Sequence, residues 1–353
     1  MHIDWAIVLA SVIVGFTVGL TGMGGGALMT PILVIFFGIT PSTAVSSDLI
    51  AAMIMKPVGG GVHIRKGTVH WNLVKWLCLG SVPMAFAGVF LLRAVANPDA
   101  VENVTKVLLG VTLCLAAGAM VFKSYMQGRR SGRRRAQGIA IRPIGEKIDV
   151  RIAATLAVGA VGGLLVGLTS VGSGSIIIVC MMLLYPQLHG PELVGTDLVQ
   201  AVPLVTAAAL AHLIVGDFVL GLTASIVIGA LPAVWVGARM SSKAPDGVIR
   251  PALVFVLLAS ALKLLNVPTT DLGLTLLVFA LVALPIWGAV DAAAHPQPVW
   301  DAAGLDREAW IRWQAWLAPI GVGFGVAVAY FGKTRRQLVH ANASVVAAET
   351  VPA

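Results

Sequence analysis

The chain has 353 residues, of which 58% are hydrophobic and only 11% charged, with a mean hydropathy of +0.92 and a formal net charge of +8. A soluble domain carries about 25% charged residues because water must solvate its surface. This composition therefore excludes a soluble globule of 36.6 kDa. We expect an all-α polytopic membrane protein, since no segment alternates with the period of two that a transmembrane barrel requires.

Apolar runs of roughly 20 residues, the length that crosses a hydrocarbon core of about 30 Å as a helix, recur along the chain. The first run follows Asp4 without a preceding basic segment, so we expect a membrane span and not a cleaved signal peptide. The predicted spans are, in chain order, residues 5–20, 71–92, 104–122, 152–168, 218–236, 252–265, 272–290 and 316–331. Shorter apolar segments lie between them at 27–37, 42–58, 175–185 and 193–215. Together these runs predict about 8–11 membrane segments.

A basic segment divides the chain. Between Lys123 and Arg151 lies a dense run of Lys and Arg, with only Glu146 and Asp149 to balance it. Such a run could be a nucleic-acid-binding arm, but between two spans it is typical of a cytoplasmic loop that obeys the positive-inside rule. The predicted organisation is a first transmembrane repeat at 1–122, a cytoplasmic basic loop at 123–151, a second transmembrane repeat at 152–266, extra C-terminal spans at 267–335 and a polar tail at 336–353.

The two halves are copies of each other. VGLTGMGGGALMTPIL at 18–33 recurs as VGLTSVGSGSIIIVCM at 166–181, and SSDL at 46–49 recurs as GTDL at 195–198. In each half a histidine follows the aspartate of that motif by the same interval along the chain. A single one-residue gap aligns residues 15–93 with 163–242, which indicates an internal duplication.

Basic residues exchange sides between the two copies. The first turn of copy one contains Arg65 and Lys66, whereas its partner in copy two has no basic residue. The later turn has the opposite distribution, with the basic residues Arg239, Lys243 and Arg250 in copy two. This exchange is typical of inverted-topology repeats. We predict that residues 124–150 face the cytoplasm and that the turn near Asp217 faces the outside; the same counting gives no consistent orientation for the last two spans.

Two glycine-rich segments interrupt the apolar runs at matched positions, GMGGG at 22–26 and SVGSG at 170–174. Glycine costs roughly 1 kcal/mol in a helix interior, and in lipid every freed backbone group needs a partner. Transporters contain such breaks where they line a substrate cavity, with helix N-termini directed at an anion. Close helix packing through small residues is the alternative explanation. Because the break is duplicated, we predict a substrate site formed by Thr21, Gly22, Gly24, Gly25, Gly26, Thr169, Ser170, Gly172, Ser173, Gly174 and Ser175.

Lys56 is an ionisable residue in the short apolar segment that follows the first break. Charges at such depth are costly in lipid and usually functional. Lys56 has no counterpart in the second copy, where Val205 occupies the matching position. An unpaired lysine is a natural contact for an anion, so we predict that Lys56 binds the substrate.

Four further ionisable residues lie at matched positions of the two copies. Asp48 and Asp197 are candidates for proton coupling, although each could instead cap a short helix after its Ser-Ser or Gly-Thr pair. His63 and His212 are also candidates for proton coupling. Their predicted position near the membrane edge favours interfacial anchoring over a proton relay.

At these residues the chain resembles the sulfite exporter TauE/SafE family of permeases. The likeness is carried by GLTGMGGG, by SSDL followed after six residues by Lys56, and by HIRKG and GSVP, with GLTSVGSGS, VGTDL, AH and ALP in the second half. It covers residues 5–266 and leaves out the arginine-rich segment and residues 270–353. The resemblance implies a carrier of the bacterial inner (plasma) membrane that transports, and commonly exports, small sulfur oxyanions or organosulfonates.

The sequence contains no H-E-x-x-H, no G-x-S-x-G and no His/Cys cluster, so we predict a transporter and not an enzyme. Its cysteines, Cys78, Cys114 and Cys180, lie in apolar runs and indicate neither a disulfide framework nor a metal site. We predict no cofactor. An anion channel and a membrane scaffold without transport activity stay open as alternatives. The expected partners are a small anionic substrate and the lipid bilayer, with no nucleic acid, and a homodimer stays open.

Overall fold

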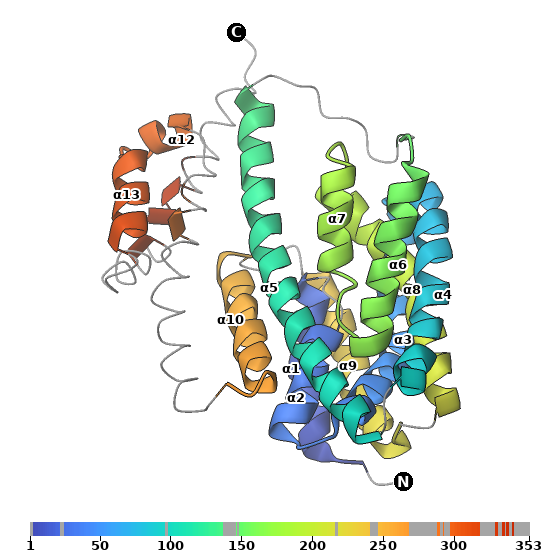
Figure 1. Ribbon diagram of the computed structural model, residues 1–353. Coiled ribbons are helices and arrows are strands. Elements are labelled where there is room, and N and C mark those ends of the chain that lie inside the picture. The colour runs from blue at the N-terminus through green and yellow to red at the C-terminus, as the bar shows by residue number, and fades with distance from the viewer. Residues whose placement is uncertain are drawn as a thin grey trace. The chain divides into compact units, whose positions relative to one another are not determined.

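A computed structural model gives the fold (Figure 1), and it describes residues 3–21, 25–95, 98–136, 146, 148–215, 218–240, 246–267, 288–289, 292, 297–317, 329–330, 334–335, 337–338 and 341. Two compact units emerge. The first comprises Met1–Ala119, Arg142–Pro245 and Val256–Val267, and the second comprises Met120–Ile141, Asp246–Phe255 and Pro268–Ala353.

The named elements of the described residues are helices. They are α1 (Trp5–Thr21), α2 (Gly26–Phe36), α3 (Pro41–Arg65), α4 (Trp71–Val95), α5 (Pro98–Ala136), α6 (Ile152–Thr169), α7 (Ile176–Leu184), α8 (Gly190–Val215), α9 (Leu220–Met240), α10 (Asp246–Leu264), α12 (Gln297–Ala302) and α13 (Arg307–Leu317). Within these residues, five helices are long and apolar enough to cross a membrane: Trp71–Ala94, Ala100–Lys123, Ile152–Thr169, Gly190–Val215 and Leu220–Met240. The prediction of several long apolar helices is thereby confirmed.

The predicted helix breaks are present in both copies. Helix α1 ends at Thr21 and α2 begins at Gly26, whereas α6 ends at Thr169 and α7 begins at Ile176. Both helices that follow a break are short, with 11 residues in α2 and 9 in α7. The predicted spans at 272–290 and 316–331 lie almost entirely outside the described residues.

Two segments that we expected to be short are long helices. Helix α3 has 25 residues and continues past the predicted end at 58 to Arg65, through Pro57 and three glycines. Helix α8 has 26 residues and continues through Pro203. Helix propensity predicts an end at such residues, but α3 and α8 pack against each other, and tertiary packing outweighs propensity. The predicted end of the first segment at 58 was therefore wrong, whereas the predicted end of the second at 215 agrees with the end of α8.

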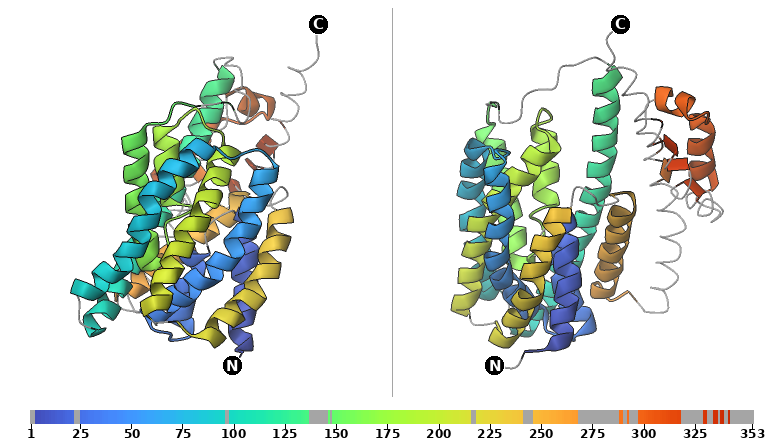
Figure 2. Two further views of the ribbon diagram at one scale, coloured as in Figure 1. Left: turned by 90° about the vertical axis from the view of Figure 1, so that its right-hand side faces the viewer. Right: turned by 180° about the vertical axis from the view of Figure 1, so that it is seen from behind.

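Helices of one repeat pack against helices of the other. In the first unit α1 lies against α9 and α4 lies against α6, while α3 contacts both α8 and α9 (Figures 1 and 2). Small residues permit the close approach. A Cβ atom on Gly15 would lie 2.7 Å from the backbone of Ala230, and one on Gly159 would lie 2.5 Å from the carbonyl oxygen of Leu77. Such contacts replace the hydrophobic driving force that is absent between helices in lipid.

The basic segment begins as helix. Helix α5 continues from Pro98 through the arginines to Ala136. Lysine and arginine are good helix formers, so the positive charge itself does not end the helix.

The second unit contains a small aromatic cluster. Trp300 and Tyr330 are fully buried, and their ring centroids lie 6.4 Å apart. Trp310 of α13 packs on the same tyrosine at 6.0 Å. The described part of this unit therefore has its own hydrophobic core.

Candidate functional site

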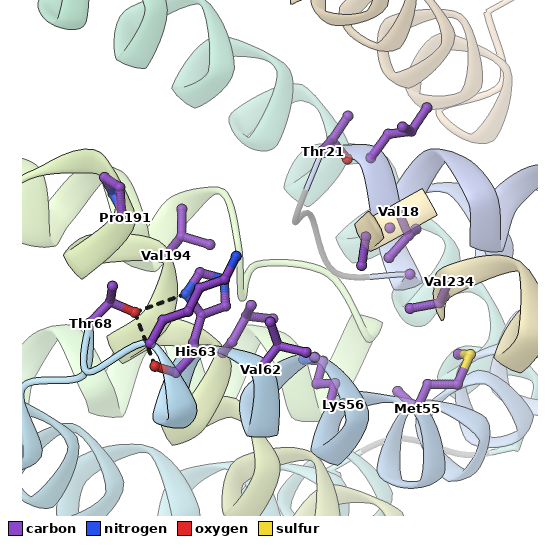
Figure 3. Close-up of a pocket in the computed structure, with 18 residues that line it drawn as sticks. Val18, Thr21, Met55, Lys56, Val62, His63, Thr68, Pro191, Val194 and Val234 are labelled. Atoms are coloured by element: carbon purple, nitrogen blue, oxygen red, sulfur yellow. Dashed lines mark hydrogen bonds between the residues drawn. The ribbon is translucent and has the colours of Figure 1, made fainter. Parts of the chain in front are cut away.

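A cavity of about 480 Å³ lies in the first unit, lined by the ends of α1, α3 and α9 and the start of α8 (Figure 3). We call it the lysine cavity. Lys56, His63 and Lys66 are the basic residues that line it, and Thr21 and Thr68 contribute hydroxyl groups. Its volume falls within the range of about 300–1,000 Å³ that is typical of small-molecule sites.

Lys56 joins the two repeats at this cavity. The side chain is half-buried on α3, and its Nζ donates a hydrogen bond of 2.6 Å to Ser173 Oγ in the second break. Its charge also interacts with the carboxyl groups of Asp48 and Asp197. The cavity therefore contains a lysine that is hydrogen-bonded to Ser173 and that lies within electrostatic reach of two carboxyl groups.

The two breaks meet each other at Gly26 and Ser170. A Cβ atom on Gly26 would overlap the backbone of Ser170, so only glycine fits at the start of α2. The Ser170 hydroxyl donates a hydrogen bond of 2.5 Å to Asp48 Oδ2, and the hydroxyl of Thr30 donates a second one of 3.2 Å to the same oxygen. Close packing, which was the alternative explanation of the glycine runs, thus holds at Gly26 itself.

Neither aspartate caps the helix that carries it. Thr40 is the N-cap of α3, whereas Asp48 lies in the interior of that helix with no exposed surface. Its Oδ1 has no hydrogen-bond partner among the described residues. Asp197 is likewise an interior residue of α8, 1% exposed, and accepts a hydrogen bond of 3.2 Å from Gln200 Nε2. The expectation that they could cap a short helix is wrong, because each helix begins well before its aspartate.

The second break is a tight, buried turn. Ser170, Gly172 and Gly174 have φ angles of 58°, 130° and 87°. The left-handed region favours glycine at the last two positions. Thr169 Oγ1 donates to the carbonyl oxygen of Leu165 in α6 at 2.7 Å and accepts a hydrogen bond of 3.2 Å from the backbone N–H of Val171 in the turn. The hydroxyl of Ser175 is buried and has no partner in the described part of the chain.

Residues at the mouth of the cavity come from both copies. His63 Nδ1 lies 3.0 Å from Thr68 Oγ1, and Figure 3 shows this pair facing Pro191 and Val194 of α8. Pro191 and Lys66 are exposed, so this end of the cavity opens near the α3–α4 turn. Lys66 was expected only to indicate topology, and no role was predicted for Thr68, Pro191 or Val194. The HIRKGT run at 63–68 was the available signal for Lys66 and Thr68.

A cluster of three ionisable side chains, of which His70 and Glu192 are buried, lies beside this mouth. His70 Nε2 lies 2.8 Å from Glu192 Oε1, and His189 Nδ1 lies 3.0 Å from Glu192 Oε2. The backbone N–H of His70 also donates to Thr196 Oγ1 at 3.1 Å. These contacts tie the turn before α4 to the start of α8. No set of three or more His, Cys, Asp or Glu side chains in the described residues is arranged to hold a metal ion.

The predicted site residues therefore separate into groups. Thr21, Gly25, Lys56 and His63 line the lysine cavity. Gly26, Asp48, Ser170 and Ser173 lie behind it, in the contact between the breaks. The residues outside the lining are Thr169, Gly172, Gly174, Ser175, Asp197 and His212. Gly22 and Gly24 lie outside the described residues.

Comparison with known proteins identifies the family. The family model described as sulfite exporter TauE/SafE matches residues 7–264. The chain belongs to this family. The "Probable membrane transporter protein YjnA" of Bacillus subtilis (strain 168) is 35% identical over 261 residues, which cover 74% of this chain and 99% of that protein. The "Probable membrane transporter protein YunE" of the same organism is 34% identical over 76 residues, 22% of this chain and 26% of that protein. No solved structure matches significantly.

As a TauE/SafE family protein, the chain is a multi-pass membrane transporter. The resemblance stated from the motifs is confirmed, and the matched range of 7–264 agrees with the expected 5–266. Every residue of the lysine cavity falls inside that range, whereas α12 and α13 fall outside it.

Proposed function

We propose that this TauE/SafE family protein exports small sulfur-containing anions, such as sulfite or an organosulfonate, and binds them in the lysine cavity. The observation that carries the proposal is the Lys56 ammonium group, held by Ser173 at the inner end of a cavity of suitable size. His63 and Lys66 add basic groups toward the mouth. An anion entering the cavity meets the Lys66 and Lys56 ammonium groups, and Lys56 replaces the water that the anion loses.

The charge balance behind Lys56 supports a coupled carrier. Two carboxyl groups, Asp48 and Asp197, share one ammonium group in a buried region. With both carboxyl groups ionised, the three residues carry a net negative charge that opposes the binding of an anion. A proton on either aspartate removes this opposition, so the affinity for the anion depends on whether these carboxyl groups carry a proton.

The membrane orientation proposed from the sequence implies that the substrate enters the lysine cavity from the cytoplasmic side. We propose that the two repeats are inverted relative to each other and that residues 123–151 face the cytoplasm of a bacterial cell. The α3–α4 turn with Arg65 and Lys66 then also faces the cytoplasm. Because the lysine cavity opens near this turn, it receives its substrate from the cytoplasm, as an exporter requires.

Binding by the purified protein is the first test. A ligand present at 100 times its Kd stabilises a folded protein by about 2.7 kcal/mol, which a thermal unfolding measurement in detergent detects. We expect sulfite, thiosulfate, sulfoacetate or taurine to raise the Tm, and simple carboxylates to do so less. If none of these compounds shifts the Tm, the proposal is overturned in favour of a scaffold.

Flux measurements distinguish a carrier from a channel. In proteoliposomes loaded with the anion that binds, a carrier accelerates uptake of labelled anion by exchange, and a driving gradient makes it accumulate. A channel lets the anion run down its own electrochemical gradient and does not exchange it against one. Simple rundown with no exchange would favour the channel and overturn the proposed carrier.

A further inference from the structure

A second, much smaller void lies in the same unit, away from the lysine cavity. Its volume is about 20 Å³, and it is lined by the start of α3, the ends of α4, α6 and α8 and the first turns of α5. A void must have a volume of about 10–15 Å³ to hold one water molecule. The void therefore holds about one water and no anion. We call it the closed void.

The closed void is the repeat counterpart of the lysine cavity. The alignment of the two copies, with its single gap, pairs six residues of the cavity with six residues of the void. The pairs are Gly19 with Gly167, Leu20 with Leu168, His63 with His212, Pro191 with Ser42, Val194 with Val45, and Ala238 with Val89. The same surfaces of the duplicated fold thus enclose an open space in one place and almost none in the other.

In five of these six pairs the residue that lines the void is more buried than its counterpart in the lysine cavity. Val194 is partly exposed in the cavity, whereas Val45 has no exposed surface. His63 is partly exposed and His212 is only 7% exposed. In the glycine, alanine–valine and proline–serine pairs the residue of the void is again more buried than its counterpart in the cavity. The two leucines are both partly exposed. The closed void is therefore the collapsed form of a space that the fold can hold open.

Hydrogen bonds that have no counterpart in the lysine cavity hold the void shut. His212 Nδ1 lies 2.7 Å from Ser46 Oγ, and His212 Nε2 lies 3.0 Å from the carbonyl oxygen of Gly167. At the corresponding place His63 faces Gly195, which has no side chain to bond.

A second contact closes the void at the start of α3. Glu102 accepts a hydrogen bond from the Ser42 hydroxyl and another, of 3.3 Å, from the Ser42 backbone N–H. The counterpart of Ser42 is Pro191, which has neither a hydroxyl nor an N–H group to donate. The Ser42–Glu102 contacts therefore cannot form at the corresponding place beside the lysine cavity.

We infer that the closed void is the exit pathway of the transporter and that the Ser46–His212 and Ser42–Glu102 contacts form its gate. This inference rests on the proposed function. When the gate contacts break, the surfaces that now form the void separate and those of the lysine cavity approach, so the anion near Lys56 gains access to the opposite side. Inverted repeats exchange their two arrangements in this way by rocking of helix groups around a fixed site.

Thiol labelling measures the two openings without any need for transport. In a variant in which Cys78, Cys114 and Cys180 are replaced by alanine, Val194→Cys reports on the cavity and Val45→Cys on the void. The counterparts Ala238→Cys and Val89→Cys, which also differ in burial, give a second pair of reporters, in case Val45→Cys does not fold. Right-side-out and inverted membrane vesicles receive a thiol reagent that does not cross the membrane. We expect the cavity reporter to react from one side only and the void reporter to be protected.

Opening the gate should change the labelling rates of the two reporters in opposite directions. Ser42→Ala combined with Ser46→Ala removes hydroxyl contacts of the gate. The loss should raise the labelling rate of Val45→Cys about tenfold, from the side opposite to that of Val194→Cys, and lower that of Val194→Cys. Thr206→Ala is the control, because the Thr206 hydroxyl bonds only the carbonyl oxygen of Val202 in its own helix among the described contacts. It should change neither rate.

Two outcomes would overturn the gate: reaction of both reporters from the same side, or unchanged rates in the Ser42/Ser46 variant. If only the proposed function is wrong, the experiments give a different result from these two outcomes. If the two reporters respond in opposite senses but no anion exchanges in proteoliposomes, the gate stands and the substrate proposal fails.

Discussion

Lys56 Nζ lies 2.6 Å from Ser173 Oγ, so a helix of the first repeat holds the break of the second at the edge of a cavity. The contact crosses the duplication and has no symmetric partner, because the residue that corresponds to Lys56 is Val205. Val205 is buried, with 1% of its surface exposed. Although the helix breaks occur in both repeats, only the first repeat has a lysine at this position, so the fold contains one charged site of this kind.

Replacement of Lys56 by methionine should weaken anion binding. Methionine keeps most of the side-chain volume but removes the ammonium group, whose contact with an anion is worth about 1.5–3 kcal/mol. The Kd of the bound anion should therefore rise by about tenfold or more. Titration of the detergent-purified variant by calorimetry measures this change.

Lys75→Met is the matched control for Lys56→Met. Lys75 is exposed on α4, where its Nζ lies 5.3 Å from the ring centroid of Trp76, and it does not line the cavity. Its replacement should leave the Kd unchanged. A folded Lys56→Met variant with the affinity of the unmodified protein would show that this lysine has a structural role only.

Replacement of Gly26 by alanine should destabilise the protein. The added Cβ atom would overlap the backbone of Ser170, which is fixed by its bond to Asp48. Overpacking of this kind costs about 1–3 kcal/mol. Thermal unfolding in detergent should show a lower Tm.

Gly61→Ala is the control for Gly26→Ala, because it should not lower the Tm. A Cβ atom on Gly61 would meet nothing within 4 Å, and the residue lies inside α3. Alanine in a helix interior is favoured over glycine by roughly 0.5–1 kcal/mol, so the Tm should not fall. Equal losses at both positions would mean that the breaks are not in tight contact.

The helix breaks and the importance of Lys56 could be predicted from the sequence, because their energetic cost in lipid depends only on neighbouring residues in the chain. Glycine runs between apolar segments, and a lysine among apolar residues, are unfavourable in lipid wherever the chain folds. The duplication then indicated which breaks belong together. The structure adds the contact between Gly26 and Ser170, which depends on the packing of two distant segments.

The different positions of His63 and His212 could not be predicted from the sequence. Their equal spacing from the aspartates suggests equal roles, yet one lines the lysine cavity and the other lies in the closed void. The difference arises because the space that His63 lines is open and the corresponding space at His212 is closed, which is a property of the conformation and not of the motif. The bond of Glu192 to His70 was also missed, since it joins connections from the two different copies.

The proposed inversion of the repeats predicts opposite sides for two matched turns. Arg65 is the exposed last residue of α3, and Val219, 52% exposed, lies just before α9. A single cysteine at position 65 should react with an impermeant reagent from the cytoplasmic side only, and one at position 219 from the outer side only. Labelling of both from the same side would exclude the inverted topology.

The remaining prediction concerns the source of energy for export. A membrane potential that is negative inside already expels an anion, with about 2.3 kcal/mol per charge per 100 mV. The protein nevertheless places two buried carboxyl groups beside Lys56, and one oxygen of Asp48 has no hydrogen-bond partner among the described residues. Intramembrane carboxyl groups of this kind are typical of proton pathways. We therefore expect at least one of Asp48 and Asp197 to carry the proton.

Asparagine at either position should uncouple anion flux from the pH gradient and leave anion binding largely intact. At position 48 the amide oxygen can still accept the hydrogen bonds of Ser170 and Thr30, so the fold should be retained. Flux in proteoliposomes is compared under a pH gradient alone and under a potential alone. Asp301→Asn, an exposed change on α12, controls for the loss of a carboxylate. If both site variants stay fully driven by the pH gradient, neither aspartate is the carrier, and the membrane potential is left as the driving force.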